Sequence, residues 1–265
     1  MNPQTPPAAA AIGAAAALLH AIRRGEQPRP AAFPPSIRLR DLLDAYEVQQ
    51  QLFRQLHWSV GGWKASMPDA TSGFSAPIAA DTLLPSPAAL TLASTPTQGT
   101  QRFGIEPEIV FRLGRDLPPL PRGTSYARET VLEAVDSAMA GIEICVCRFE
   151  NFEVAPLLDR LADGLMNEAL VLGTAQPAWR ALDLPRLTLR VRVDGQPAHE
   201  GVGGHPIGDP VIPLTWMANH LSVRGIGLRK GEVITTGSCN GIRWLLPGQR
   251  VEIEYGGLGS AAIAF

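Results

Sequence analysis

The stretch Phe103-Gly-Ile-Glu-Pro-Glu-Ile-Val-Phe-Arg-Leu-Gly114 carries the pattern that decides the fold. Apolar residues at positions 105, 109 and 111 alternate with Glu106, Glu108 and Val110, and this period of two is typical of a β-strand. Side chains two residues apart on a strand point to the same face, so the two carboxylates are predicted to lie side by side. Carboxylates at that separation repel each other unless a positive group lies between them.

The paired glutamates have two interpretations. A hard divalent cation such as Mg2+ would relieve the repulsion, because it binds oxygen ligands and keeps coordination sites open for water or substrate. Alternatively, the segment is an exposed edge strand with two solvated glutamates. Pro107 has no N–H to give to a ladder, which suits an edge or a bulge. The spacing by itself leaves both interpretations open.

The composition is that of an ordinary globular protein. The chain has 265 residues, 45% of them hydrophobic and 18% charged, which is enough for one large domain or two small ones. A net charge of −2 gives no indication of binding to nucleic acid or to a membrane surface. Cys145, Cys147 and Cys239 form no C-x-x-C pair. The first two are predicted as small core residues on one strand face, and a reduced, cytoplasmic compartment is expected.

Helices are predicted mainly near the N-terminus. The alanine-rich segment has no basic region before it, so we expect a helix from Pro7 to about Arg24 rather than a signal peptide. Apolar residues at helical spacing predict three more helices, over Leu39 to about Leu56, Arg128–Gly141 and Pro210–Arg224. No apolar run is long enough to span a bilayer, and no membrane partner is expected.

Most of the remaining chain is predicted to form short strands between Gly- and Pro-rich loops. Strands are expected over Ile142–Arg148, 232–237, Arg250–Tyr255 and Ser260–Phe265, with a hairpin turn at 256–259 joining the last two. Many strands, few helices and no regular βαβ alternation predict an α+β fold. Its sheet is expected to be mixed and mainly antiparallel, with N-terminal helices.

Several short motifs follow one another in a familiar order from about residue 39 to the C-terminus. They are Asp44-Ala-Tyr-Glu-Val-Gln49, Gly61-Gly-Trp-Lys64, Glu106-x-Glu108, Gly114-Arg-Asp-Leu-Pro118, Gly141-Ile-Glu143, Asp159-Arg-Leu-Ala-Asp163, Gly208-Asp-Pro210 and Gly256-Gly-Leu-Gly-Ser260. In order and spacing the chain resembles the 2-keto-4-pentenoate hydratase / 4-oxalocrotonate decarboxylase family, a branch of the fumarylacetoacetate hydrolase-like superfamily. The resemblance implies an N-terminal tail and helical segment, residues 1–58, packed on a catalytic domain of that fold, residues 59–265.

The resemblance also implies a metal site. Members of the family hold Mg2+ or Mn2+ on three carboxylates, and the matching positions here are Glu106, Glu108 and Glu143. A metal with open coordination sites suits a 2-oxo acid, whose carboxylate and 2-oxygen chelate it in a five-membered ring. On the residues alone, Glu143 points opposite Ile142 and Ile144 and would equally well face solvent.

Two residues match catalytic positions of the family. Lys64 matches an active-site lysine that stabilises enolate charge or assists proton transfer, whereas an isolated lysine is usually just solvated. Asp81 matches an acidic residue proposed in relatives to activate water, but an Asp ahead of Thr82 would also form a simple turn.

Substrate contacts are expected around residues 237–241. Ser238 matches a family loop near the substrate carboxylate, although the glycines around it are enough for a tight turn. Asn240 replaces a small hydroxyl residue of that loop, and Gly164 stands where many relatives have Asn. These changes bear on the distal part of the substrate more than on the chemistry. The residues predicted to line the altered pocket are Met67, Arg148, Asn167, Asn240, Arg243 and Trp244.

The five histidines show no metal-binding pattern. None has a spaced His or Cys partner that would suggest zinc. His205 is expected at the surface, although the glycine-rich loop before it could bring it to an active site.

The predicted function is a Mg2+- or Mn2+-dependent hydratase. It would add water to a 2-hydroxy-2,4-dienoate of the 2-keto-4-pentenoate type and give a 4-hydroxy-2-oxo acid, in aromatic-compound catabolism. The main alternative is decarboxylation of a 4-oxalocrotonate-type diacid, with Arg148 or Arg243 holding the distal carboxylate. C–C bond hydrolysis and non-catalytic binding of a 2-oxo acid are further alternatives. The expected partners are a small 2-oxo or 2-hydroxydienoic acid and further copies of the chain in a homo-oligomer, and no nucleic acid.

Overall fold

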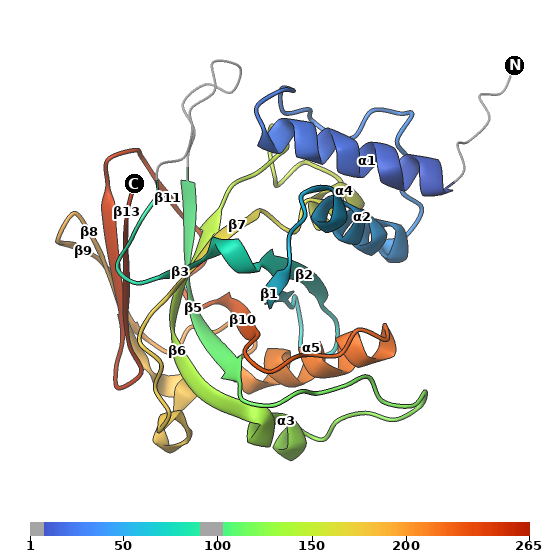
Figure 1. Ribbon diagram of the computed structural model, residues 1–265. Helices are drawn as coiled ribbons and strands as arrows, with labels where there is room; N and C mark the ends of the chain where they lie inside the picture. Colours follow the sequence, from blue (N-terminus) through green and yellow to red (C-terminus); the bar gives the residue numbers. More distant parts are fainter. Residues whose placement is uncertain (1–7, 91–102) are drawn as a thin grey trace, which may run out of the picture.

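The computed structural model describes residues 8–90 and 103–265, which form two β-sheets and five α-helices (Figure 1). The large sheet has the strand order β2-β1-β10-β5-β6-β7-β3, and β11 pairs with β5. Its strands are β1 Val60–Ser66, β2 Phe74–Ala79, β3 Leu83–Pro85, β5 Phe103–Leu113, β6 Val135–Cys145, β7 Asn167–Leu172, β10 Val233–Ser238 and β11 Arg243–Leu245.

The small sheet has the order β4-β13-β12-β8-β9. Its strands are β4 Ala88–Ala89, β8 Thr188–Val193, β9 Gln196–Val202, β12 Arg250–Tyr255 and β13 Gly259–Ala264. Only the pairs β1–β10, β3–β7 and β4–β13 are parallel among the described strands. The predicted α+β class with mixed, mainly antiparallel sheets is therefore confirmed.

Strand β5 lies in the middle of the large sheet, so the predicted strand is confirmed and the edge-strand alternative is wrong. It pairs with β6 along its length on one side, and on the other with β10 from residue 108 onward and with β11 at 103–105. Pro107 falls where β10 ends and β11 begins. Its carbonyl accepts the amide of Cys239 at 2.9 Å. A strand residue directs its N–H and C=O to the same side, so the missing N–H faces this interruption and no ladder bond is lost.

The predicted helix Arg128–Gly141 is wrong in its second half. Helix α3 covers only Arg128–Ala134, and the chain then continues directly as β6. Met139 and its neighbours have helical apolar spacing, but the segment is buried apart from Asp136. It pairs with β5 on one side and, at Ala138 and Gly141, with Gln176 and Leu172 on the other. Pairing on both sides outweighs the local preference for helix.

The other helices agree with the prediction apart from their ends. They are α1 Ala8–Arg23, α2 Leu42–Gln55 and α5 Val211–Val223. The short helix α4 Leu157–Ala162 was not predicted. The start predicted at Pro7 lies outside the described residues. Helix α2 begins after Asp41, whose carboxylate accepts the amides of Leu43 and Asp44 as an N-cap. No helix in the ranges 8–90 and 103–265 is both long and apolar enough to cross a membrane.

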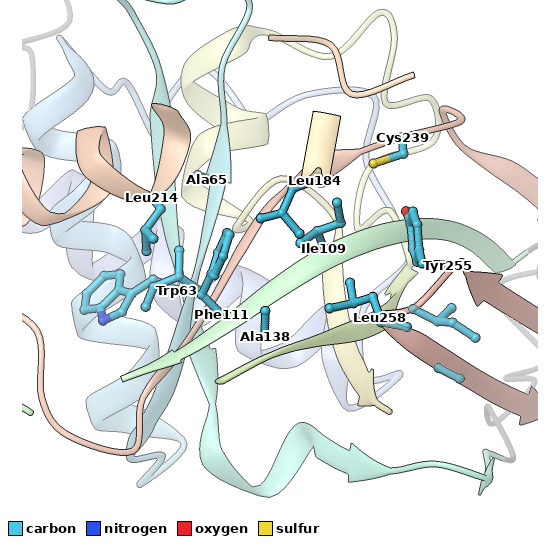
Figure 2. Packing of buried hydrophobic residues seen from close by; sticks show 14 of the residues in the cluster. Trp63, Ala65, Ile109, Phe111, Ala138, Leu184, Leu214, Cys239, Tyr255 and Leu258 are labelled. Atoms are coloured by element: carbon cyan, nitrogen blue, oxygen red, sulfur yellow. The ribbon is translucent and has the colours of Figure 1, made fainter. Parts of the chain in front are cut away.

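The main core lies between the two sheets and helix α5. Trp63 and Phe111 on the large sheet, Leu214 on α5 and Tyr255 and Leu258 at the small sheet all belong to it (Figure 2). A second cluster joins α1 and α2 to α4 and Phe149. Both N-terminal helices therefore pack on the rest of the chain, at the end of the molecule away from β8 and β9 (Figure 1).

Candidate active site

Strand register places four charged side chains on one face of the large sheet. Glu106 on β5 is the direct partner of Glu143 on β6, and Glu108 is two residues from Glu106. Lys64 on β1 is the partner of Thr235 on β10, which in turn pairs with Val110. Register partners share a face and side chains alternate along each strand, so all four charged groups lie on the face opposite Trp63 and Phe111.

Lys64 is buried among the carboxylates. Its Nζ donates to Glu143 Oε1 at 2.8 Å and to the Leu165 carbonyl at 3.0 Å, and it lies 3.9 Å from Glu106 Oε2. Burial disfavours the charged ammonium, but attraction to Glu143, Glu106 and Glu108 outweighs it and raises the pKa of Lys64. Lys64 therefore keeps its proton at neutral pH and is a cation and proton donor rather than a base.

Glu108 and Glu143 are fully buried on this face, and hydrogen bonds reach one oxygen of each. Glu108 Oε2 accepts the Gly237 amide at 2.8 Å, and Glu143 Oε1 accepts Asn167 Nδ2 at 2.9 Å in addition to Lys64. Among the described residues, Glu108 Oε1 and Glu143 Oε2 have no hydrogen-bond partner. Burial, together with the charges of Glu143 and Glu106, raises the pKa of Glu108 well above its usual range. Burial also raises the pKa of Glu106, although Lys64 partly offsets this.

These carboxylates fit a hard divalent cation. Buried polar atoms are normally satisfied, and a cation would satisfy the two unpartnered carboxylate oxygens and offset the repulsion between their charges. Oxygen ligands are those that Mg2+ and Mn2+ prefer. Glu106 and Glu143 offer such oxygens within 4.8 Å of each other, whereas no oxygen of Glu108 belongs to that group of atoms.

Cys145 also belongs to this group, although the sequence analysis treated it only as a core residue. Its thiol, a carboxylate oxygen of Glu106 and one of Glu143 lie within 4.8 Å of one another. Burial and the neighbouring carboxylates raise the pKa of the Cys145 thiol well above its usual value. The thiol stays protonated and points toward Glu106 Oε2 at 3.6 Å, a poor ligand for a hard cation. Its position two residues after Glu143 was the signal that placed it on this face.

Three consecutive residues beside Lys64 have left-handed backbone. Gly164, Leu165 and Met166 have φ values of 75°, 55° and 70°. This conformation is unfavourable for Leu and Met, and such strain concentrates at functional sites. It turns the Leu165 carbonyl onto Lys64, which holds the ammonium in place.

A cavity of about 660 Å³ opens beside the carboxylates. Glu106 is in its wall, together with Met166, Trp244 and Phe152, and with Arg29 from the loop between α1 and α2. Trp244 was predicted as a pocket residue, whereas Met67, also predicted, is not among the lining residues, and nothing in the sequence had pointed to Met166 or Arg29. A pocket beside charged groups with shifted pKa values is the usual setting of a small-molecule active site.

The remaining predicted residues lie at different distances from this face. Ser238 is the register partner of Glu108, and its Oγ donates to the Gly241 carbonyl at 3.0 Å and accepts the Asn240 amide, so the 237–241 turn lies beside the carboxylates. Asp81 is exposed in a short 3₁₀ turn after β2. That end of β2 pairs with Val60, four residues and roughly 13 Å along β1 from Lys64.

Neither predicted arginine is directed at the carboxylates. Arg243 pairs in register with Ile105, on the opposite face of the sheet, and its guanidinium donates to the Ala198 carbonyl of β9 at 3.0 Å. Arg148 is buried in ion pairs with Asp163, at 3.6 Å, and with Glu168. Burial and repulsion from Arg23 lower the pKa of Arg148 to about 9.

The comparisons with known proteins agree with this fold. Residues 47–264 match the model of the fumarylacetoacetate (FAA) hydrolase C-terminal family. The chain belongs to the fumarylacetoacetate hydrolase family. A 2-keto-4-pentenoate hydratase of Paraburkholderia xenovorans is 31% identical over 161 residues, which are 61% of this chain and 58% of that protein. A 4-oxalocrotonate decarboxylase of Pseudomonas putida is 28% identical over 135 residues, 51% of each chain.

A solved structure extends the likeness to nearly the whole fold. It is the 4-oxalocrotonate decarboxylase of Pseudomonas putida G7, complexed with magnesium and adipate, with a TM-score of 0.80 and 20% identity over 96% of this chain and 97% of that one. The predicted family and fold, N-terminal helices included, are thereby confirmed. The aligned stretch covers only 58% of the first hydratase, so the family is established and the particular reaction is not.

Proposed function

We propose that the chain is a Mg2+- or Mn2+-dependent hydratase that converts a 2-hydroxy-2,4-dienoate into a 4-hydroxy-2-oxo acid, as in the catabolism of aromatic compounds. One observation carries the proposal: Lys64, Glu106, Glu108 and Glu143 share one sheet face, and two buried carboxylate oxygens there have no partner among the described residues. The similarity to curated 2-keto-4-pentenoate hydratases supports the same reaction class.

Each residue has a stated part in this reaction. Glu106, Glu108 and Glu143 would hold the metal, which stabilises negative charge on the 2-oxygen of the substrate when bound. Ketonisation moves a proton onto carbon 5, and water then adds its hydroxyl to carbon 4 and its proton to carbon 3. Lys64 stays protonated, so its role is to stabilise the enolate oxygen and to donate a proton. Ser238 would bind the substrate carboxylate from its turn.

Asp81 is proposed to direct the water. It lies past the end of β2, so this role requires the substrate to extend along β1 from Lys64. The variant Asp81→Asn tests it: turnover falls if Asp81 orients the water, and unchanged turnover removes Asp81 from the mechanism.

The test of the function is an absorbance assay with freshly generated 2-hydroxypenta-2,4-dienoate. With Mg2+ or Mn2+ the dienol absorbance should fall and 4-hydroxy-2-oxopentanoate should accumulate, and EDTA should stop both. Glu108→Gln should lose metal-dependent turnover, whereas Glu133→Gln, an exposed residue of α3, should keep it. A Glu108→Gln variant with the wild-type rate would overturn the proposal.

Decarboxylation of a diacid is the second candidate, and Arg29 is the observation that favours it. Arg29 lines the same cavity as Glu106. Behind it lie Arg23 and Arg148, whose ion-pair partners in the described residues are the two carboxylates of Asp163 and Glu168. Glu106, Glu150 and Glu153 line the same cavity as Arg29. Repulsion between Arg29 and Arg148 contributes to the lowered pKa of Arg148. An anion in the cavity would reduce that repulsion.

In that reaction the distal carboxylate leaves as CO2, and the electron pair of the broken C–C bond enters the dienolate that ends at the 2-oxygen. Arg29→Gln should then raise KM for 4-oxalocrotonate about tenfold or more and leave the KM of the monoacid dienoate unchanged. Arg29→Lys should recover part of the loss. Equal effects on both substrates would remove Arg29 as the anchor of a distal carboxylate.

Two other functions make different predictions. A C–C bond hydrolase would cleave an acylpyruvate and release two acids. A non-catalytic binding protein would bind oxalate or pyruvate in the presence of metal and turn over none of these substrates.

A further inference from the structure

His205 is buried in the loop between β9 and α5, where it was expected at the surface. Its side chain is 7% exposed. The Ile207 amide donates to His205 Nδ1 at 3.2 Å, and His205 Nε2 lies 2.9 Å from the Thr236 carbonyl. Because Nδ1 accepts a hydrogen bond, the ring proton lies on Nε2, which donates to Thr236. Burial lowers the pKa of His205, in keeping with a neutral ring.

The Thr236 carbonyl belongs to the same peptide unit as the Gly237 amide. A trans peptide is planar and directs its C=O and N–H in opposite directions. At one edge of this planar unit the Thr236 carbonyl accepts the N–H of His205. At the opposite edge the Gly237 amide donates to Glu108 Oε2 at 2.8 Å. A rotation of the plane that broke one of these bonds would break the other as well.

This peptide unit lies in an irregular part of β10. The pairing of β10 with β5 passes from Thr235 directly to Ser238, and Gly237 has a φ of 110°. The register pairs therefore skip residues 236 and 237, and the regular ladder does not fix the orientation of this plane. The Thr236 hydroxyl donates to the Ile109 carbonyl at 2.8 Å, and the bond from His205 to the Thr236 carbonyl fixes the peptide plane itself.

We propose that His205 is a positioning residue that orients the metal-binding carboxylate of Glu108 through the Thr236–Gly237 peptide. The inference rests on the proposed metal site but not on the reaction catalysed there. With Oε2 held by the Gly237 amide, Oε1 is the oxygen presented to a cation. Residues that orient ligands in this way typically change metal affinity about 10- to 100-fold when they are replaced.

The test compares variants that keep or remove the donor at Nε2. His205→Gln places an amide N–H near the position of Nε2, whereas His205→Phe fills the space without a donor. We expect His205→Phe to bind Mn2+ at least about tenfold more weakly than wild type, and His205→Gln to recover most of the affinity. Free Mn2+ is followed by its electron paramagnetic resonance signal during titration of the metal-free protein. If the Phe variant does not fold, His205→Met, close to Gln in size, replaces it.

Two controls separate positioning from general loss of stability. Ser222→Ala removes another buried side-chain hydrogen bond, to the Leu120 amide, far along the chain from the carboxylates, and should leave Mn2+ affinity unchanged. In a Glu108→Gln background, His205→Phe should cause no further loss of affinity, because its route to the metal is already removed.

The outcomes separate this inference from the proposed function. The role of His205 would be overturned if His205→Phe bound Mn2+ with wild-type affinity. It would also be overturned if His205→Phe weakened Mn2+ binding by the same factor in the Glu108→Gln background as in wild type. Either result would leave the metal site standing. A wild-type chain that binds no Mn2+ would overturn both.

Discussion

The ammonium of Lys64 lies 2.8 Å from Glu143 Oε1 and 3.9 Å from Glu106 Oε2, so it is the positive charge nearest to the proposed metal ligands. The period-two pattern was sufficient to predict that Glu106 and Glu108 are neighbours. The places of Glu143 and Lys64 depend on strand register, which the chain alone does not reveal, and only the family resemblance pointed to them. Arg29 and His205 could not be found in this way, because loops carry no periodic pattern.

Replacing Lys64 tests this balance of charges. Lys64→Met removes the ammonium and leaves three carboxylates facing one another. Because breaking a buried ion pair is costly, the free energy of unfolding should fall by about 3 kcal/mol or more. The metal-free variant should therefore melt at a lower temperature than metal-free wild type, and Mn2+ should raise its melting temperature by a larger amount. Differential scanning calorimetry with and without Mn2+ measures both. An equal Mn2+ shift in the two proteins would contradict this assignment of charges.

At the scale of elements, the prediction succeeded where one local pattern determined the outcome. The apolar face of α2 was sufficient for that helix, although its start after the Asp41 N-cap was not predicted, and the alternation in β12 was sufficient for the strand. It failed at residues 135–141, where the apolar spacing fits a helix but the segment pairs with β5 and is buried on both faces from 137 to 141. A fully buried strand has no alternation to distinguish it from a helix.

Helix α5 carries a histidine that should make stability depend on pH. His220 stacks on Trp216 at 4.5 Å, and burial, then the charge of Arg224, lowers the pKa of His220 to about 4. In the unfolded chain the histidine has a pKa near 6.5, so as the pH falls the unfolded state is protonated at His220 before the folded state is. The contribution of His220 is therefore fully present above pH 6.5 and is lost as the pH falls from 6.5 to 4.

His220→Phe should remove that dependence and keep the ring stacking. Between pH 6.5 and 4 the free energy of unfolding of wild type should fall by about 2 kcal/mol more than that of the variant, allowing for the partial exposure of the ring. Urea unfolding at a series of pH values measures the difference. Parallel curves for the two proteins would show that His220 does not titrate as described.

At the scale of the whole molecule, α1 and α2 pack as part of a common core with later segments. Leu19 and Leu52 share a cluster with Phe149 and Leu161, which lie in the segment that follows the strand carrying Glu143. The loop between these helices brings Arg29 to the cavity. The apolar spacing predicted the two helices, but it did not predict that they pack on α4 and Phe149. Contacts between residues so far apart in the chain leave no local pattern.

Leu19→Ala tests whether the N-terminal segment unfolds together with the catalytic domain. Leu19 is fully buried, so its truncation should lower the free energy of unfolding by about 2–5 kcal/mol. One cooperative transition is expected by circular dichroism and by tryptophan fluorescence. A separate early transition confined to helix signal would show that residues 1–58 unfold independently.

Equilibrium binding of Mn2+ to wild type and to Glu143→Gln tests the central claim most directly. Glu143 is fully buried, contacts Lys64 and Asn167, and has one oxygen with no partner among the described residues. The account predicts one Mn2+ per wild-type chain, and binding about 100-fold weaker or undetectable in Glu143→Gln. Wild-type affinity in that variant would show that the three carboxylates are not the metal site.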